Sequence, residues 1–151
     1  MTICFKKIKE KAKIPTFGHN DDTNYDVDLY ACLDKIIVIP PGKSANVPTG
    51  VAWMPMDIPY NHKVSMKIES RSGFAINNSI EASNAGRIDE GYRGEIIMKI
   101  YNRGDKDFVV ENGLRIAQGA VEVCPKYAII EVNEIDSTDR GDRGFGSSGV
   151  N

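Results

Sequence analysis

The 151-residue sequence predicts an all-β protein, a jelly-roll-like barrel or sandwich subunit. Its apolar runs are short and rich in Val and Ile, and Pro, Gly, Asn and Asp separate them at spacings typical of strands and turns. Apolar and polar residues alternate clearly over residues 63–69, as in a strand with one buried face. No helical pattern lies between the strands, which argues against a parallel α/β sheet.

We expect strands at residues 3–5, 26–31, 35–39, 46–54, 63–69, 93–101, 108–110, 115–123 and 126–133. The best helical segment, residues 72–78, is long enough for a turn or two only. A chain of this length predicts one hydrophobic core. We therefore expect one β domain over residues 1–138 and a flexible Gly/Ser/Arg-rich arm over residues 139–151.

Composition excludes several classes of protein. The net charge is −2 and the basic residues alternate with acidic ones, so no basic field exists for nucleic acid. No apolar run approaches the length of a membrane span or a secretory leader. Cys4, Cys32 and Cys124 are odd in number and widely spaced, so we expect buried, reduced thiols in a cytoplasm-like compartment, which includes the nucleus or a host cytoplasm.

Two common sources of chemistry are also excluded. Gly42-Lys43-Ser44 ends like a P-loop, but Ile37 stands where the upstream glycine is required. His19 and His62 lie in polar, loop-like sequence without a nucleophile nearby. The chemistry must come from acids, arginines and the backbone.

The last thirteen residues combine two arginines, four glycines, two serines and one phenylalanine with almost nothing that could join a core. Glycines let backbone N–H groups converge on an anion, and arginine forks match phosphate oxygens. A lone aromatic ring offers a face to a planar base. Such an arm suits a nucleotide polyphosphate, although a disordered tail has a similar composition.

Acids, arginine and glycine are densest over residues 84–94. Read as structure, this segment is a β-hairpin with its turn at Asp89-Glu90-Gly91. Read as function, its exposed backbone groups can recognise a base edge, Tyr92 can lie under a sugar, and Asp89 can accept a proton from water.

Five segments in order carry a family resemblance: YDVDLYA (25–31), SRSG (70–73), GRIDEGYRG (86–94), GLRIAQ (113–118) and RGDRGFGSSG (140–149). They resemble the five motifs of the trimeric dUTP diphosphatases, the dUTPases. The third and fifth motifs are the most specific. Ser70 stands where the family usually has proline, and Asp26 stands where the first motif often has glycine.

The resemblance implies a jelly-roll subunit that assembles as a homotrimer with active sites shared between subunits. It implies hydrolysis of dUTP to dUMP and pyrophosphate, which keeps uracil out of DNA and supplies dUMP for thymidylate synthesis. Asp89 would activate the water that attacks the α-phosphate, and Gln118 would help to place phosphate or water. Expected partners are the nucleotide and the other subunits, with no nucleic acid and no membrane.

Other matched positions are implied to bind substrate. The backbone around Asn84, Gly86 and Ile88 would read uracil, and Tyr92 would pack beneath the deoxyribose. The phosphates would be held by Arg71, Ser72 and Gly73 of a neighbouring subunit. From the arm, an arginine would meet the terminal phosphate, a phenylalanine would cover uracil and backbone amides would bind phosphate, at positions Arg140, Phe145, Gly146, Ser147 and Ser148.

Magnesium is the implied cofactor. Asp28 would lie near Mg²⁺ and contact it through water. The sequence has no cluster of carboxylates for an all-protein cage, as expected where the triphosphate and water supply most ligands.

Three alternatives remain at this point. A dCTP deaminase on the same fold would need a catalytic glutamate, whereas Asp89 followed by Tyr92 favours dUTP hydrolysis. A nucleotide-responsive regulatory or interaction protein could keep the pocket and act through a partner. A structural β domain with a solvated tail would turn over no nucleotide.

Overall fold

The structure is a computed structural model that describes residues 1–18, 25–83 and 86–144. The all-β prediction is confirmed. The strands are β1 (Thr2–Lys7), β2 (Thr16–Phe17), β3 (Val27–Tyr30), β4 (Ile37–Ile39), β5 (Ser44–Pro48), β6 (Val51–Met56), β7 (His62–Ser70), β8 (Ile80–Ser83), β9 (Ile88–Asp89), β10 (Ile97–Asn102), β11 (Phe108–Val110) and β12 (Arg115–Pro125). Within the described ranges the only helix is α1 (Ser72–Asn78), and no helix has the length and apolar content that a membrane span requires.

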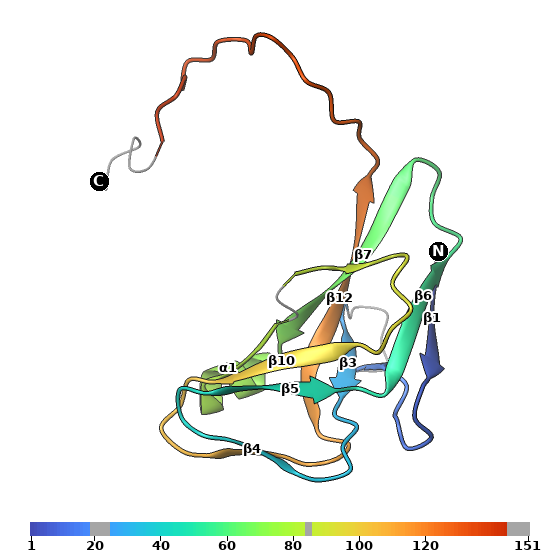
Figure 1. The fold of residues 1–151 in the computed structure, drawn as a ribbon, viewed down its shortest axis with the longest axis vertical. Helices are drawn as coiled ribbons and strands as arrows, with labels where there is room; N and C mark the ends of the chain where they lie inside the picture. The colour runs from blue at the N-terminus through green and yellow to red at the C-terminus, as the bar shows by residue number, and fades with distance from the viewer. Residues whose placement is uncertain (19–24, 84–85, 145–151) are drawn as a thin grey trace.

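The strands form antiparallel sheets around one core (Figure 1). The largest sheet has the order β2-β3-β12-β7-β9. A three-stranded sheet, β5-β10-β8, and the pairs β1-β6 and β4-β11 complete the body. The long strands β7 and β12 pair along most of their length, from Ala117 opposite Ser70 to Pro125 opposite His62. This pair is the frame from which the candidate site is built.

Apolar residues from every sheet meet in one cluster. Its largest fully buried side chains include Trp53, Leu29, Met66, Met98 and Ile100. On β7 the residues Val64, Met66 and Ile68 are buried, and the residues between them are more exposed, as the alternation predicted. Burial of one face therefore fixes which side chains of β7 face outward.

The expected strand at residues 46–54 is two strands, β5 and β6, because the chain bends at Gly50. Gly50 has φ of +70°, a conformation that residues with a Cβ rarely adopt. A Cβ at this position would also lie 2.7 Å from the Cys32 thiol sulfur. The apolar pattern runs through the bend, so periodicity alone did not reveal it.

Two further expectations are wrong. The described part of the segment 84–94, residues 86–94, does not form a hairpin: a turn closes from the Tyr92 N–H to the Asp89 carbonyl at 3.0 Å, but β9 pairs with β7, and β10 begins only at Ile97. Residues 126–133 form no strand. Beyond Tyr127 the described chain leaves the body (Figure 1).

The cysteines are free thiols, as expected, but they differ in burial. Cys32 is buried, Cys4 is half-buried and Cys124 is exposed. The expected burial is therefore wrong for Cys124, which lies near the end of β12.

Candidate active site

The predicted site residues fall into two groups on this chain. The first, the Asp28 cluster, consists of the predicted residues Asp28, Arg71 and Gln118 together with Arg115, which was not predicted. Asp28 lies on β3, Arg115 and Gln118 lie on β12, and Arg71 follows directly after β7. These strands are neighbours in the largest sheet, so antiparallel pairing brings residues together that are far apart in the sequence.

Asp28 is the centre of this cluster. Its side chain is 1% exposed, and its Oδ1 and Oδ2 lie 3.0 Å from Arg71 Nε and 2.9 Å from Arg115 Nη1, respectively. A buried carboxylate is costly unless cations accompany it, and here two do. The group of three side chains keeps one net positive charge, which suits an anionic ligand.

The arginines retain donors for such a ligand. Arg71 Nη1 also donates to the Arg115 carbonyl at 3.1 Å. A guanidinium has five N–H donors in a fixed fork, so these contacts orient Arg71 without using all of them. Both side chains are partly exposed. The cluster therefore offers fixed N–H groups at the surface.

Gln118 and the start of α1 lie beside Asp28 and Arg71. Gln118 is opposite Asp28 on one side and Glu69 on the other, so these three side chains share one face of the sheet. Ser72 and Gly73 are the first residues of α1, and the first helical hydrogen bonds are donated only by Phe74 and Ala75. The first amides of a helix have no partner within it and can bind an anion.

The fit of Mg²⁺ to Asp28 is limited by the arginines. Both carboxylate oxygens face guanidinium groups, so direct coordination would displace one of them. No hydrogen bond reaches Oδ1 among the described residues, although Arg71 Nε is close. That oxygen is buried within this chain, so the expected contact of Asp28 with Mg²⁺ through water stays a prediction. Residues 1–18, 25–83 and 86–144 contain no group of three or more Asp, Glu, His or Cys that could hold a metal alone.

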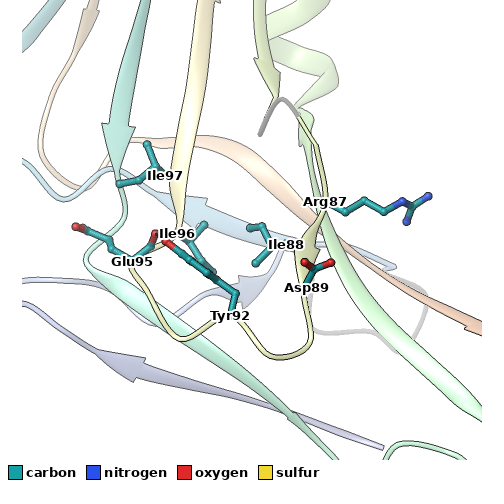
Figure 2. A pocket seen from close by; sticks show the side chains of 7 residues that line it. All are labelled: Arg87, Ile88, Asp89, Tyr92, Glu95, Ile96 and Ile97. Carbon is teal, nitrogen blue, oxygen red and sulfur yellow. Dashed lines mark hydrogen bonds between the residues drawn. The ribbon is translucent and has the colours of Figure 1, made fainter.

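The second group surrounds a small cavity at β9. A cavity of about 220 Å³ is lined by Arg87, Ile88, Asp89, Tyr92, Glu95, Ile96 and Ile97 (Figure 2). Isoleucines and Tyr92 supply apolar surface, and Arg87, Asp89 and Glu95 supply polar groups. Its volume is below the ~300–1,000 Å³ of typical ligand pockets. One chain therefore supplies only part of a nucleotide site here.

Asp89 is available for chemistry. Its residue is exposed, and among the described residues its carboxylate makes no ion pair or hydrogen bond. β9 holds its backbone opposite Ser65 of β7. A carboxylate that is fixed at its backbone and free at its oxygens can accept a proton from water.

Tyr92 is fixed at the edge of the same cavity. Its hydroxyl donates to the Glu95 carbonyl at 3.2 Å. The ring lies over Gly94, where a Cβ would be 2.3 Å from the hydroxyl oxygen. Glu95 is itself held, because its Oε1 accepts the Gly50 N–H at 2.7 Å. The ring therefore presents a stable face to a ligand.

The structure does not bring the two groups together within one chain. Asp89 is opposite Ser65, whereas Arg71 follows the other end of β7. At about 3.3 Å per residue, six residues of extended chain separate them by roughly 20 Å. Within the described chain, Asp89 and Arg71 therefore belong to separate parts of the surface.

The remaining predicted residues are placed as follows. Arg140 is exposed in the arm, and its Nε donates to the Arg143 carbonyl at 3.1 Å. Gly86 and Ile88 lie at the start of the cavity segment. Outside the described residues lie Asn84, Phe145, Gly146, Ser147 and Ser148.

Sequence reasoning missed Arg115 and Glu95. Arg115 lies in one of the quoted motifs, but its function as a partner of Asp28 depends on strand pairing across 87 positions. Glu95 supports Tyr92 through its carbonyl and Gly50 through its carboxylate. The sequence signal was the position of Arg115 within a motif and of Glu95 directly after one.

The two departures from the motif pattern have structural consequences. Ser70 Oγ accepts the Ala82 N–H at 2.8 Å and so ties β8 to the end of β7. At Asp26, burial and secondarily the nearby Glu69 carboxylate raise the pKa of the carboxyl group.

Comparison with known proteins agrees with the motifs. A family model described as dUTPase matches residues 10–149. Deoxyuridine 5′-triphosphate nucleotidohydrolases of Clostridium tetani and Alkaliphilus metalliredigens are each 40% identical over 149 residues, covering 98% of this chain and 97% of the relative. A solved Staphylococcus bacteriophage 80alpha dUTPase with dUpNHpp is 25% identical, has a TM-score of 0.80 and covers 99% of each chain. The chain belongs to the dUTPase family, the enzymes that hydrolyse deoxyuridine 5′-triphosphate.

Proposed function

We propose that the protein hydrolyses dUTP to dUMP and pyrophosphate at sites that combine the Asp28 cluster of one subunit with the Asp89 cavity of another. The observation that carries this proposal is the separation of the two groups along β7. One group has oriented cations and no free base, and the other has a free carboxylate and a cavity. Each supplies what the other lacks.

Phosphate binding is assigned to the Asp28 cluster. Asp28 holds Arg71 in place, and the remaining N–H groups of Arg71 meet phosphate oxygens together with the amides of Ser72 and Gly73. Gln118 places a phosphate oxygen or the attacking water. Phosphoryl transfer depends mainly on positioning and charge neutralisation, which such groups provide without forming a covalent bond.

Water activation is assigned to Asp89. Its carboxylate takes a proton from the water as oxygen attacks the α-phosphorus, and pyrophosphate leaves. The absence of competing ion pairs on this carboxylate, within the described part of the chain, supports the role. A positioned general base typically contributes ~10²–10⁴-fold to the rate.

Recognition of the nucleoside is assigned to the cavity and Tyr92. The backbone at Gly86 and Ile88, with Asn84, pairs with the uracil edge. The Tyr92 ring lies beneath the deoxyribose and leaves no space for a 2′-hydroxyl group. The hydroxyl contact to Glu95 and the close approach to Gly94 support a fixed ring.

Assembly as a trimer completes the site. The segment after β12 carries apolar side chains that this chain does not cover, with Ile129 and Ile135 each 90% exposed. Its sequence is strand-like, and an extended segment without a partner strand can pair with the edge of another copy. Three copies in closed symmetry give three equivalent sites.

Magnesium enters with the substrate in this proposal. Mg²⁺ bound to the triphosphate neutralises phosphate charge and helps to orient it. Asp28 is the residue that would contact it through water. Residues 1–138 form the proposed catalytic domain, and the arm, residues 139–151, is proposed to cover bound nucleotide, with Arg140 at the terminal phosphate, Phe145 over uracil and the amides of residues 146–148 on phosphate oxygens.

A turnover assay tests the proposal. Purified protein with Mg²⁺ is given dUTP, dCTP, dTTP or UTP, and nucleoside monophosphate and pyrophosphate are measured. We expect release from dUTP and far less from the others. Deamination of dCTP would indicate a deaminase, and tight dUTP binding without turnover would favour a regulatory protein.

A further inference from the structure

The strand that carries Asp89 is short and lies at the edge of its sheet. Described pairing of β9 is limited to Asp89 opposite Ser65 and Ile88 opposite Met66, both on β7. A strand of two residues makes few backbone hydrogen bonds, so its position depends on other contacts. Side chains on both sides of β9 supply them.

Arg87 holds the beginning of β9. Its Nη1 donates to Ser65 Oγ at 3.0 Å and to Glu122 Oε2, with which it forms an ion pair. Ser65 is on β7, and Glu122 lies opposite it on β12. One guanidinium therefore ties β9 to the next two strands of the sheet. Figure 2 shows the Arg87 side chain extending away from Tyr92.

Glu90 holds the end of β9. Its Oε2 accepts the backbone N–H of Val64 at 3.0 Å. Val64 precedes Ser65 on β7, so the carboxylate takes the place that a further paired residue would have. Arg93 Nη1 donates to the Glu90 carbonyl at 2.6 Å and stabilises the following turn.

We propose that Arg87, Glu122 and Glu90 form a clamp, the β9 clamp, that positions the Asp89 carboxylate for catalysis. The three are positioning residues that do not touch the substrate. This inference rests on the proposed role of Asp89 as the general base. A base displaced by about 1 Å can lose ~10²-fold in rate.

The clamp predicts a loss of rate rather than of stability. The Arg87–Glu122 side chains are 52% and 37% exposed. Exposed ion pairs contribute little to global stability, because solvent screens them. The pair restrains the local motion of β9. We propose that without this restraint the Asp89 carboxylate is misplaced.

The first test is a double-mutant cycle on the full-length protein. Arg87→Met and Glu122→Ala should each lower kcat for dUTP about 10- to 100-fold, with KM within about twofold and Tm nearly unchanged. The double variant should have a kcat no lower than that of Arg87→Met alone, because Arg87→Met already removes the ion pair with Glu122 together with the hydrogen bond to Ser65. The matched control is Arg103→Met, which removes a similarly exposed ion pair with Glu81 at 3.0 Å and should leave kcat unchanged.

Conservative variants test whether these residues position Asp89 or only support the fold. Arg87→Lys keeps a charged donor and should retain more kcat than Arg87→Met. Glu90→Gln keeps a carbonyl acceptor for Val64 and should retain more kcat than Glu90→Met. Hydrogen exchange supplies a readout besides activity: in Arg87→Met the amides of residues 86–92 should exchange faster, and those of β12 should not change.

Specific outcomes would overturn the inference. A low kcat in Arg87→Met, with normal kcat in both Glu122→Ala and Ser65→Ala, would indicate direct contact of Arg87 with substrate. Normal kcat in both, or unchanged exchange at residues 86–92, would show that the clamp does not position Asp89. If wild-type protein and Arg103→Met both fail to hydrolyse dUTP, the proposed function fails instead, and hydrogen exchange alone then decides whether the clamp restrains β9.

Discussion

Asp89 and Arg71 are separated along strand β7: Asp89, on β9, is opposite Ser65 in the first half of β7, and Arg71 directly follows Ser70 at its end. The strand pairs with β12 along its length and with β9 over two residues, and it packs on the core through Val64, Met66 and Ile68. It therefore acts as a rigid spacer. In the proposed mechanism, the base and the phosphate-binding arginine are roughly 20 Å apart in one chain, at ~3.3 Å per residue, and serve one reaction because another subunit contributes.

Asp89→Asn keeps the shape of the side chain and removes the proton acceptor. We expect kcat for dUTP to fall by ~10²–10⁴-fold, the range for a lost general base, while binding of a non-hydrolysable dUTP analogue survives. Steady-state kinetics and calorimetric titration measure the two quantities. Turnover close to that of the wild type would remove Asp89 from the mechanism.

Tyr92→Ala removes the surface proposed to exclude a 2′-hydroxyl group. Turnover of UTP relative to dUTP should rise, while the preference for dUTP over dCTP stays, because base recognition uses backbone groups. Unpaired buried polar groups discriminate by up to ~10⁴-fold, so base choice should be robust. If the substitution reduced the selectivity for uracil over cytosine and left the selectivity for deoxyribose over ribose intact, Tyr92 would not be the residue that packs against the sugar.

Asp26→Asn should stabilise the protein at neutral pH. Burial, and secondarily the Glu69 carboxylate, raise the pKa of Asp26 above 3.8 in the folded protein. Between the pKa of Asp26 in the unfolded state and its higher pKa in the folded state, the folded protein binds more protons. Ionised Asp26 therefore lowers the stability of the protein at pH values above both pKa values, and it has no effect on stability at pH values well below both. Tm of Asp26→Asn should exceed that of the wild type at about pH 7 and match it at about pH 3. Asp105→Asn, in an exposed loop, is the control. An equal gain at both pH values would contradict the assignment.

Truncation after residue 138 tests the arm. The described part of this segment is exposed, so its loss should leave Tm and the oligomeric state unchanged. Activity should fall strongly, because the proposed contacts of Arg140 and Phe145 with nucleotide are lost. Full activity in a folded, truncated protein would confine the site to residues 1–138.

Local patterns predicted the parts of the fold that local forces determine. The helix expected at residues 72–78 matches α1, which ends where Ser79 adopts a left-handed conformation with φ of 55°. The alternation at residues 63–69 lies within β7. The break at Gly50 was missed because it depends on close packing against Ala12 and Cys32, which belong to distant segments.

Pairing between distant segments was not predictable in the same way. β9 is only two residues long, and its partner β7 lies more than twenty residues earlier. The local sequence therefore predicted a hairpin that the described residues do not form. The ion pair between Asp28 and Arg115 joins strands that are distant in sequence. Residues 126–133 have the composition of a strand, but a strand needs a partner, and the described part of this chain supplies none.

The motifs nevertheless selected residues that are close together in the fold, although their roles in the site stay predictions. Asp28, Arg71 and Gln118 were selected from three separate motifs, and the structure brings them to one place. Resemblance supplied the roles, because a residue type alone does not specify one. The structure adds Arg115 to that cluster and the separation of the cluster from Asp89.

Mixed oligomers of two inactive chains test the shared site most directly. Asp89→Asn lacks the base, and Arg71→Gln lacks the guanidinium but keeps a donor for Asp28. Each variant is first shown to fold and to form the same oligomer by light scattering, and the two are refolded together in equal amounts. Mass spectrometry of the intact oligomers confirms mixing. Random assembly with base and arginine from neighbouring subunits should restore about one quarter of wild-type dUTP hydrolysis, since about a quarter of sites then have both residues intact. No recovery in confirmed mixed oligomers would contradict a site shared between subunits.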